Sequence, residues 1–179
     1  PPASRPGDTD GDGFTDVIEL AAGTSPINSA ETPLGNQPPA MVLALTDARG
    51  AVSLNRAKPG RDSLVLRGTF AVPDGLELAN QRLTFAVGAV GKSVLLNARG
   101  VYKGQDGVIR VQGKGKRTET ASFNIRLASG SFDEALPWAG GDSNTKGVAT
   151  VMETSVTVLL GDVLYEMPGQ QARIVVRSR

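Results

Sequence analysis

The chain of 179 residues contains no cysteine and no histidine. These two absences exclude disulfides, thiol nucleophiles, the usual zinc sites and any Ser-His-Asp arrangement. Aromatic residues make up only 4% of the chain, which limits any binding site that depends on ring stacking. No apolar run approaches the roughly 18 residues that a membrane-spanning helix needs. We therefore expect no thiol or histidine chemistry, and no membrane span.

Charged residues are unevenly distributed, although the net charge is only +1. Residues 1–19 hold five acidic side chains and one arginine, so the remaining 160 residues carry a net charge of +5. That excess is too small and too scattered to indicate nucleic-acid binding. A hydrophobic content of 40% indicates a globular chain, and 179 residues are enough for one good core or for one domain plus a small appendage. The chain begins at Pro1 without a signal sequence, which indicates a mature product or a piece of something longer.

The segment Asp8–Glu19 has acidic residues at its positions 1, 3, 5, 9 and 12 and a glycine at position 6. This is the ligand spacing of an EF-hand calcium loop. Because Ca²⁺ takes six to eight oxygens at roughly 2.3–2.6 Å, a short chain must wrap closely around the ion. Five carboxylates in so short a segment also repel one another unless a cation lies among them. The alternative is a solvated acidic turn.

The predicted ligands are oxygen atoms at alternate positions of this loop. Glu19 closes the sphere with both oxygens, while Asp16 binds directly or through a water. Gly13 makes the sharp turn that a residue with a β carbon resists. The full predicted set is the carboxylates of Asp8, Asp10, Asp12, Asp16 and Glu19 and the backbone carbonyl of Phe14. We therefore predict Ca²⁺ as the cofactor.

The loop is expected to form only half of an EF-hand. The preceding residues, 1–7, are rich in proline and cannot form the usual entering helix. The segment Asp16–Ala22 after the loop is predicted to be helical, and Gly23 suits the residue that ends it. Its apolar face is predicted to contain Val17, Leu20 and Ala21.

Asp8–Glu19 followed by LAAGTSP resembles a bacterial thrombospondin type 3 calcium-binding repeat, which commonly reads D-x-D-x-D-G-x-x-D-x-x-E and then G-T-D-P. Ser25 stands where the family usually has Asp or Asn. No second acidic run follows Ile27, so the resemblance implies a single ion. It also implies a calcium-stiffened spacer in a secreted or surface protein, here of the bacterial cell surface.

A change of pattern near residue 38 predicts two domains. Ser29–Pro39 is rich in proline and polar residues, as a linker is. Residues 1–37 would then hold the lead-in, the calcium loop and the linker, and residues 38–179 a β domain. From Met41 onward apolar and polar residues alternate, which predicts half-buried antiparallel strands. Clear examples are Leu83–Val87, Phe123–Leu127, Ser155–Val158 and Arg173–Arg177.

The fold class predicted for this domain is an antiparallel, immunoglobulin-like β-sandwich of eight to ten strands. Glycine-rich turns separate the runs, and Gly161-Asp162 suits a two-residue hairpin. A capping box at Ser131–Glu134 predicts one helical turn. The general sequence pattern of Asp62–Phe132 resembles that of uncharacterised β domains of large secreted bacterial proteins.

Two other clusters have a functional and a structural interpretation. Acidic residues near the single tryptophan could act as glycosidase carboxylates, but a capped turn with the tryptophan packed into the end of the sandwich is the better interpretation, since capping alone explains Asp133 and Glu134. These residues are Asp133, Glu134 and Asp142, around Trp138. A basic patch could bind phosphate, but a solvated hairpin is the simpler interpretation. It consists of Lys114, Lys116 and Arg117. We expect no enzymatic activity.

Three functions remain. The first is a calcium-binding extracellular structural or adhesion module, with protein partners or self-association. The second is a subunit of an extracellular filament or surface layer, joined through sheet edges or a strand donated from residues 170–179. The third is a carbohydrate-binding module, with surface polysaccharide as the ligand. Its stacking residues would be Trp138, Tyr102 and Tyr165.

Overall fold

The computed structural model describes residues 7–55, 57–58, 60–113, 119–132, 149–167 and 172–178. These residues form one short helix and eleven strands, more than the eight to ten predicted, so the protein is mainly β. The elements are α1 (Asp16–Ala22), β1 (Met41–Leu54), β2 (Asp62–Ala71), β3 (Arg82–Val87), β4 (Val90–Leu95), β5 (Val101–Gly104), β6 (Gly107–Gly113), β7 (Thr120–Gly130), β8 (Ala149–Thr154), β9 (Val156–Leu160), β10 (Val163–Glu166) and β11 (Ala172–Ser178).

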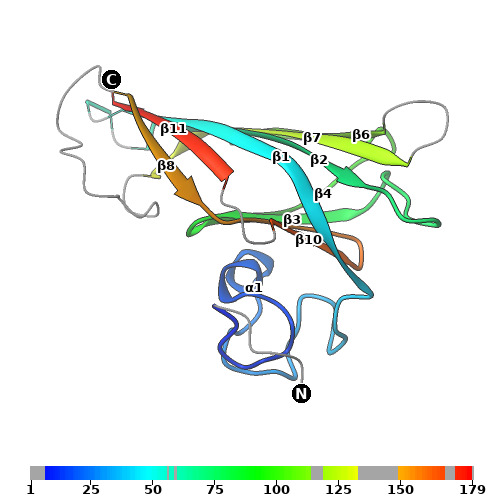
Figure 1. Cartoon of the computed structure of the whole chain (residues 1–179). Helices are drawn as coiled ribbons and strands as arrows, with labels where there is room; N and C mark the ends of the chain where they lie inside the picture. The colour runs from blue at the N-terminus through cyan, green and yellow to red at the C-terminus, as the bar shows by residue number, and fades with distance from the viewer. Residues whose placement is uncertain are drawn as a thin grey trace.

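Strand β1 connects the two halves of the sheet. Its residues 41–44 pair in parallel with β10, and its residues 49–54 pair in parallel with β11. Along its other side it pairs antiparallel with β2. The register shifts between Thr46 and Arg49, and Asp47 there has a φ of 55°, which marks a β-bulge that bends the strand. Because β1 changes partners along its length, both halves belong to one continuous sheet (Figure 1).

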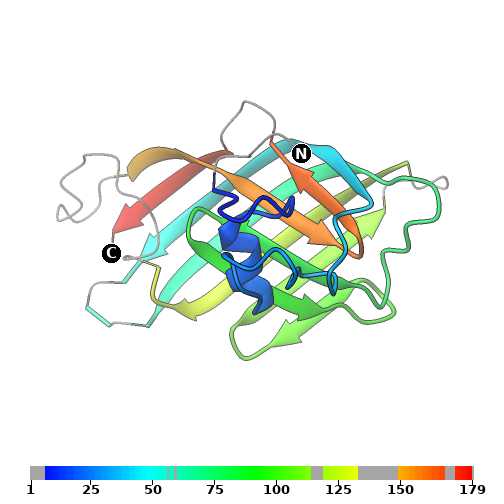
Figure 2. The ribbon, with the colours of Figure 1, turned by 90° about the horizontal axis from the view of Figure 1, so that it is seen from below.

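The strands follow the order β4-β3-β9-β10-β1-β2-β7-β6-β5, and β11 and β8 extend from β1. The sheet curls so that its halves face each other, and it nearly closes into a barrel (Figures 1 and 2). Lys92 of β4 forms an ion pair with Asp106 in the β5–β6 turn and lies 5.3 Å from the ring centre of Tyr102 on β5. The predicted immunoglobulin-like sandwich is not confirmed, and the two parallel pairings of β1 depart from the antiparallel pattern expected.

The main core lies between the two halves. On β2 and β7 the predicted alternation is confirmed, because inward residues are buried and their neighbours are partly or fully exposed. Phe70 of β2 packs against Phe123 of β7 at a ring-centre distance of 6.3 Å and against Tyr165 of β10 at 4.6 Å. These rings hold the two halves together from within.

On β3 and β9 the alternation fails because both faces are covered. Thr84, predicted to be on the polar face of β3, is 1% exposed, and every residue of β9 is buried. Helix α1 lies across the outer face of β3, β4 and β9, as the view from below shows (Figure 2). A second apolar cluster fills the space between them. It consists of Phe14, Ile18, Ala86, Leu159 and Leu164.

The predicted turns are confirmed where the structure describes them. Gly161-Asp162 connects β9 to β10 as a two-residue hairpin, and Leu160 pairs with Val163. Other hairpins connect β3 to β4 and β5 to β6. The predicted helical turn at Ser131–Glu134 and one of the glycine-rich turns predicted between the strands, at Gly140–Asn144, lie, wholly or in part, outside the described residues. Within the described residues, no helix has the length and apolar character needed to cross a membrane.

Candidate calcium site

The loop before α1 is built by aspartate side chains that accept backbone hydrogen bonds. The two Asp8 carboxylate oxygens accept from the N–H groups of Gly11, at 2.8 Å, and Gly13, at 3.2 Å. Asp12 accepts from the N–H of Phe14 at 2.8 Å. Gly13 has a φ of +99°, a backbone conformation that residues with a β carbon rarely adopt, as expected for the sharp turn. The chain therefore wraps around its own carboxylates.

Asp16 closes this loop at its base. Its N–H donates to the carbonyl of Gly7 at 2.6 Å, and its carboxylate accepts from both the N–H and the hydroxyl of Thr9 at 2.8 Å. The helix predicted at Asp16–Ala22 is confirmed with these bounds. It ends at Gly23, which has a φ of 85° and donates to the carbonyl of Glu19 at 2.8 Å. The loop and the helix thus form one continuous unit.

Two apolar side chains fix this unit to the sheet. Phe14 and Ile18 are both fully buried in the second cluster, against Ala86 and Leu159 of the strands. The predicted apolar face of the helix is wrong at Leu20, which is 66% exposed. The α-helical period explains the error, because Leu20 lies about 200° around the helix from the buried Ile18 and therefore faces solvent. Glu19, beside Ile18, is buried as a result.

Glu19 is the most unusual residue of this segment. Its side chain is fully buried, and neither carboxylate oxygen has a hydrogen-bond partner. One oxygen each of Asp10 and Asp12 is likewise buried without a partner. Unpartnered buried carboxylate oxygens are costly, and a bound cation is one of the few groups that satisfies several of them at once. Carboxylate oxygens are also the ligands that Ca²⁺ prefers, so the residues present fit this ion.

The carboxylates are close enough to share an ion. One oxygen from each of Asp8, Asp10 and Asp12 lies within 4.8 Å of the others. Burial, followed by the charges of Asp12 and the other loop carboxylates, raises the pKa of Glu19 to about 8. Burial is also the largest cause of the raised pKa of Asp12, and the charges of Asp10 and Asp8 add to it. Without a cation, this site favours a proton on Glu19 at neutral pH.

Comparison with known families supports the same chemistry. Residues 8–29 match the bacterial TSP3 repeat. The matched segment contains the whole acidic loop and α1, and a β-rich domain follows it. TSP3 repeats bind calcium, so the match and the aspartate cluster both indicate a calcium-binding module. A search of curated proteins finds no match to the chain, and a search of solved structures finds none either.

Of the six residues predicted as ligands, the structure brings Asp8, Asp10 and Asp12 together and buries Glu19 within reach of their charges. Asp16 faces Thr9. Sequence reasoning chose Phe14 for its carbonyl and missed that its side chain anchors the loop. It also missed Ile18. The available signal was an apolar residue on either side of the helix start, Phe14 in the loop and Ile18 in the first turn.

The other predicted sites do not add to this one. Tyr165 is fully buried and donates to the carbonyl of Ala71 at 3.0 Å, so it cannot stack on a sugar. Tyr102 is half-buried, and its hydroxyl donates to Asp106. The 170–179 segment contains β11, which already pairs with β1 and β8. The remaining candidates lie outside the described residues. They are Asp133, Glu134, Trp138, Asp142, Lys114, Lys116 and Arg117.

Proposed function

We propose that residues 8–19 bind one Ca²⁺ ion and that the ion fixes the loop and α1 against the β domain. The observation that carries this proposal is Glu19, whose two buried oxygens have no partner. The ligands would be those predicted from the sequence. They are the carboxylates of Asp8, Asp10, Asp12, Asp16 and Glu19 and the carbonyl of Phe14. Asp16, which faces Thr9, would act through a water.

The ion would act on the sheet through the helix. Glu19 and Ile18 are adjacent on α1, and Ile18 is buried between the helix and the sheet. Calcium bound to the Glu19 carboxylate would therefore keep Ile18 in its apolar contact with the sheet. That contact would in turn keep the Glu19 carboxylate at the ion. Residues 1–37 would then act as a stiff, ion-dependent extension of the domain at residues 38–179.

A calcium site of this kind suits an extracellular protein. Calcium loops of extracellular modules have dissociation constants of about 10⁻⁴–10⁻³ M, near the calcium concentration expected outside cells. An ion at one to ten times its dissociation constant adds about 0.4–1.4 kcal/mol to the stability of the state that binds it. We place the protein in the bacterial secreted or cell-surface class, as a structural or adhesion module that acts by binding partners rather than by catalysis.

Isothermal titration calorimetry with Ca²⁺ tests the site. The unaltered chain should bind one ion, and Glu19→Gln should weaken binding by at least about ten-fold, because a neutral amide removes a bidentate ligand. Glu77→Gln is the matched control, since Glu77 is exposed and distant from the loop in sequence. Equal affinities for the unaltered chain and Glu19→Gln would remove Glu19 from the site, and no binding at all would refute the proposal.

A further inference from the structure

A row of four arginines and one asparagine crosses the outer face of the sheet, on five neighbouring strands. Arg49 of β1 pairs with Arg173 of β11 on one side and with Arg67 of β2 on the other. Arg67 pairs with Asn124 of β7, which pairs with Arg110 of β6. Directly paired residues of neighbouring strands project from the same face. These five residues form the arginine row.

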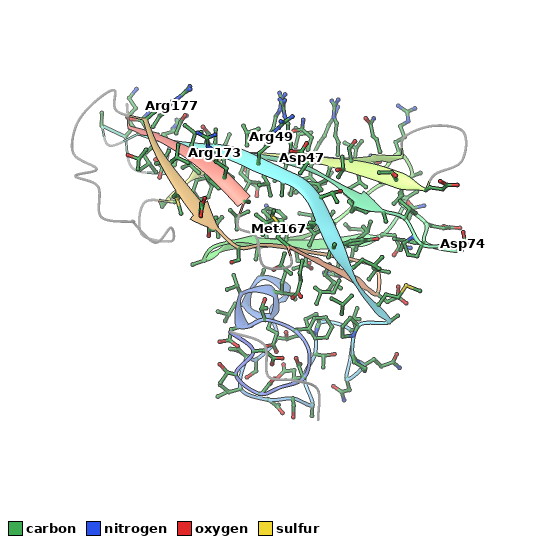
Figure 3. All side chains as sticks on the ribbon, viewed as in Figure 1. Asp47, Arg49, Asp74, Met167, Arg173 and Arg177 are labelled. Atoms are coloured by element: carbon green, nitrogen blue, oxygen red, sulfur yellow. The ribbon has the colours of Figure 1, made fainter. Side chains whose placement is uncertain are left out.

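Two further arginines, Arg126 and Arg177, project from the same face, because the residues beside them point into the core. Strands β1, β2, β6, β7 and β11 contain no lysine. Arg49, Arg173 and Arg177 extend from the sheet on the side opposite α1 (Figure 3). Arginine alone thus supplies the positive charge of these five strands.

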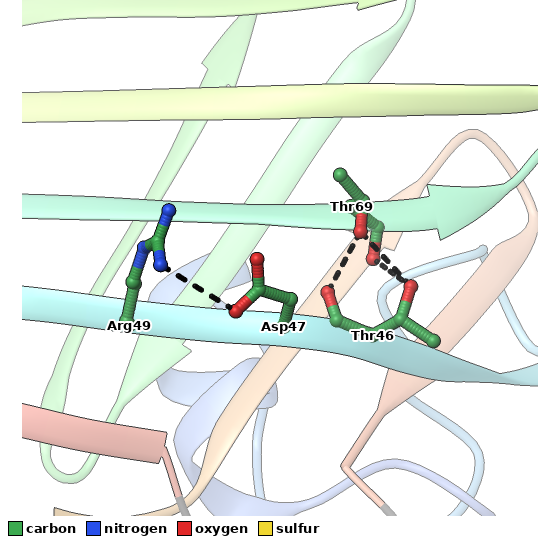
Figure 4. Close-up of polar contacts among 4 residues, drawn as sticks. All are labelled: Thr46, Asp47, Arg49 and Thr69. Atoms are coloured by element: carbon green, nitrogen blue, oxygen red, sulfur yellow. Dashed lines mark hydrogen bonds and ion pairs between the residues drawn. The ribbon is translucent and has the colours of Figure 1, made fainter.

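Few acidic side chains offset this charge. Asp47 lies 3.9 Å from the Arg49 guanidinium, and both side chains are at least 66% exposed, so the pair is weak (Figure 4). Glu153 of β8 is paired with Arg173. Next to the bulge, the paired residues Thr46 and Thr69 exchange hydroxyl-to-carbonyl hydrogen bonds of 3.0 Å between β1 and β2 (Figure 4). These hydrogen bonds hold β1 to β2 beside the arginines.

Two shallow cavities follow the row and share Arg49 and Arg67. The first, of about 330 Å³, is bordered by those two arginines and Arg173, with Val65 and Val175 among its apolar lining residues. The second, of about 390 Å³, continues to Arg110 and is lined mainly by polar residues. The outer face is therefore hollowed along the line of the guanidinium groups.

This arrangement is not needed for folding. Like charges directly opposite each other on paired strands are destabilising, and Arg49 faces an arginine on both sides. Basic residues often protect an edge strand from pairing with another chain, but β1, β2 and β7 lie inside the sheet. A bound polyanion would relieve this repulsion.

We infer that the arginine row binds a linear acidic polysaccharide. The guanidinium fork binds carboxylate and sulfate groups through two hydrogen bonds, which lysine cannot do. Strands are spaced about 4.8 Å apart, so the row extends for roughly 19 Å. The spacing between neighbouring strands is close to the length of one sugar unit in an extended polysaccharide. Successive acidic sugars can therefore lie over successive strands.

The chemistry of this face disfavours other polyanions. Phe70 and Phe123, the aromatics of these five strands, are buried in the core, so no ring is presented for the stacking that single-stranded nucleic acid requires. The apolar residues beside the row, Val65 and Val175, are short and only partly exposed, so they offer little to insert between lipids. The inference is independent of the proposed calcium site, because the row lies on the far side of the sheet from α1 (Figures 1 and 3).

The test measures binding of a labelled oligogalacturonate, too short to gel with Ca²⁺, by fluorescence anisotropy at constant calcium and salt. Chondroitin sulfate, neutral dextran, single-stranded DNA and phosphatidylglycerol vesicles are the comparison ligands. The triple variant Arg49→Gln, Arg67→Gln, Arg173→Gln should bind the oligosaccharide at least about ten-fold more weakly. The matched control, Arg61→Gln, Arg82→Gln, Arg99→Gln, changes the net charge equally but leaves the row intact and should bind normally.

A second variant separates hydrogen-bond geometry from charge. Arg49→Lys, Arg67→Lys, Arg173→Lys keeps the charge and removes the forks, so its affinity should fall between those of the unaltered chain and the glutamine triple. Circular dichroism melting confirms that each variant is folded. No binding to either acidic saccharide, equal losses in the two glutamine triples, or tighter binding to DNA or vesicles would each overturn the inference.

Discussion

Ala21 of α1 packs directly on Gly91 of β4, so closely that a β carbon added to Gly91 would lie 2.6 Å from the β carbon of Ala21. This contact joins the proposed calcium-binding unit to the sheet at a point where both partners are small. It complements the apolar contact of Ile18, and together they set how near the helix can approach the strands. The position of Glu19 depends on both.

Gly91→Ala should push α1 away from the sheet and weaken Ca²⁺ binding. Overpacking of this kind costs about 1–3 kcal/mol. The double variant Gly91→Ala, Ala21→Gly restores the space and should recover part of the loss, although glycine in the helix costs up to about 1 kcal/mol. Calcium titrations of the four proteins in this cycle give the coupling between the two positions. Strictly additive effects would show that the two residues do not touch.

Ile18→Ala should destabilise the docking of α1 far more than Leu20→Ala does. Ile18 is fully buried, and truncation of such a residue costs about 2–5 kcal/mol, whereas Leu20 is exposed and alanine favours helix. Proteolysis of the loop at fixed calcium measures the difference. Faster cleavage in Leu20→Ala than in Ile18→Ala would reverse the assignment of the buried face.

Glu19→Gln should have opposite effects with and without calcium. In EDTA a buried Glu19 must take up a proton as α1 docks, which glutamine does not need, so α1 should be held more firmly at neutral pH, by about 1–3 kcal/mol. In saturating calcium the same variant loses a ligand and should be less stable than the unaltered chain. Thermal melts under both conditions provide the comparison. A change of the same sign in both would mean that Glu19 has no link to the ion.

Alkaline pH should destabilise the core through Tyr165. Burial, with a smaller effect of Asp162, raises the pKa of this phenol to about 12 in the folded protein, compared with about 10 when unfolded. The folded state therefore prefers the neutral phenol. This stability is fully present below pH 10 and is lost as the pH rises toward 12, by roughly 2–3 kcal/mol in total.

The measurement is denaturant unfolding at a series of pH values for the unaltered chain and Tyr165→Phe. Phenylalanine cannot ionise, so the variant should lose stability less steeply between pH 10 and pH 12. Tyr102→Phe serves as the control for a tyrosine outside the centre of the core and should keep the steep decline. Parallel curves for the unaltered chain and Tyr165→Phe would exclude Tyr165 as the source.

The sequence predicted local features well and long-range pairing poorly. The loop, the bounds of α1 and the hairpin at Gly161-Asp162 follow from residue spacing and turn chemistry within a few positions. The two parallel partners of β1 do not, because pairing between residues 41–54 and the strands after residue 162 leaves no local signal. The buried outer face of β3 was missed for the same reason, since α1 covers it from elsewhere in the chain.

The candidate site shows the same division. Acidic spacing identified Asp8, Asp10, Asp12 and Glu19, but only the packed structure shows that Glu19 is fully buried and unpartnered. The arginine row was invisible in the sequence, because its members are far apart along the chain and meet only through strand register. The net charge of the whole chain, +1, does not reveal the row, because acidic residues elsewhere in the chain offset its arginines.

The central claim is that one ion orders the loop and α1 on the sheet. Hydrogen-exchange mass spectrometry in millimolar calcium and in EDTA tests it directly. We predict that residues 7–35 lose protection in EDTA while the paired amides of β2 and β7 exchange equally slowly in both conditions. Identical exchange of residues 7–35 with and without calcium would contradict the account.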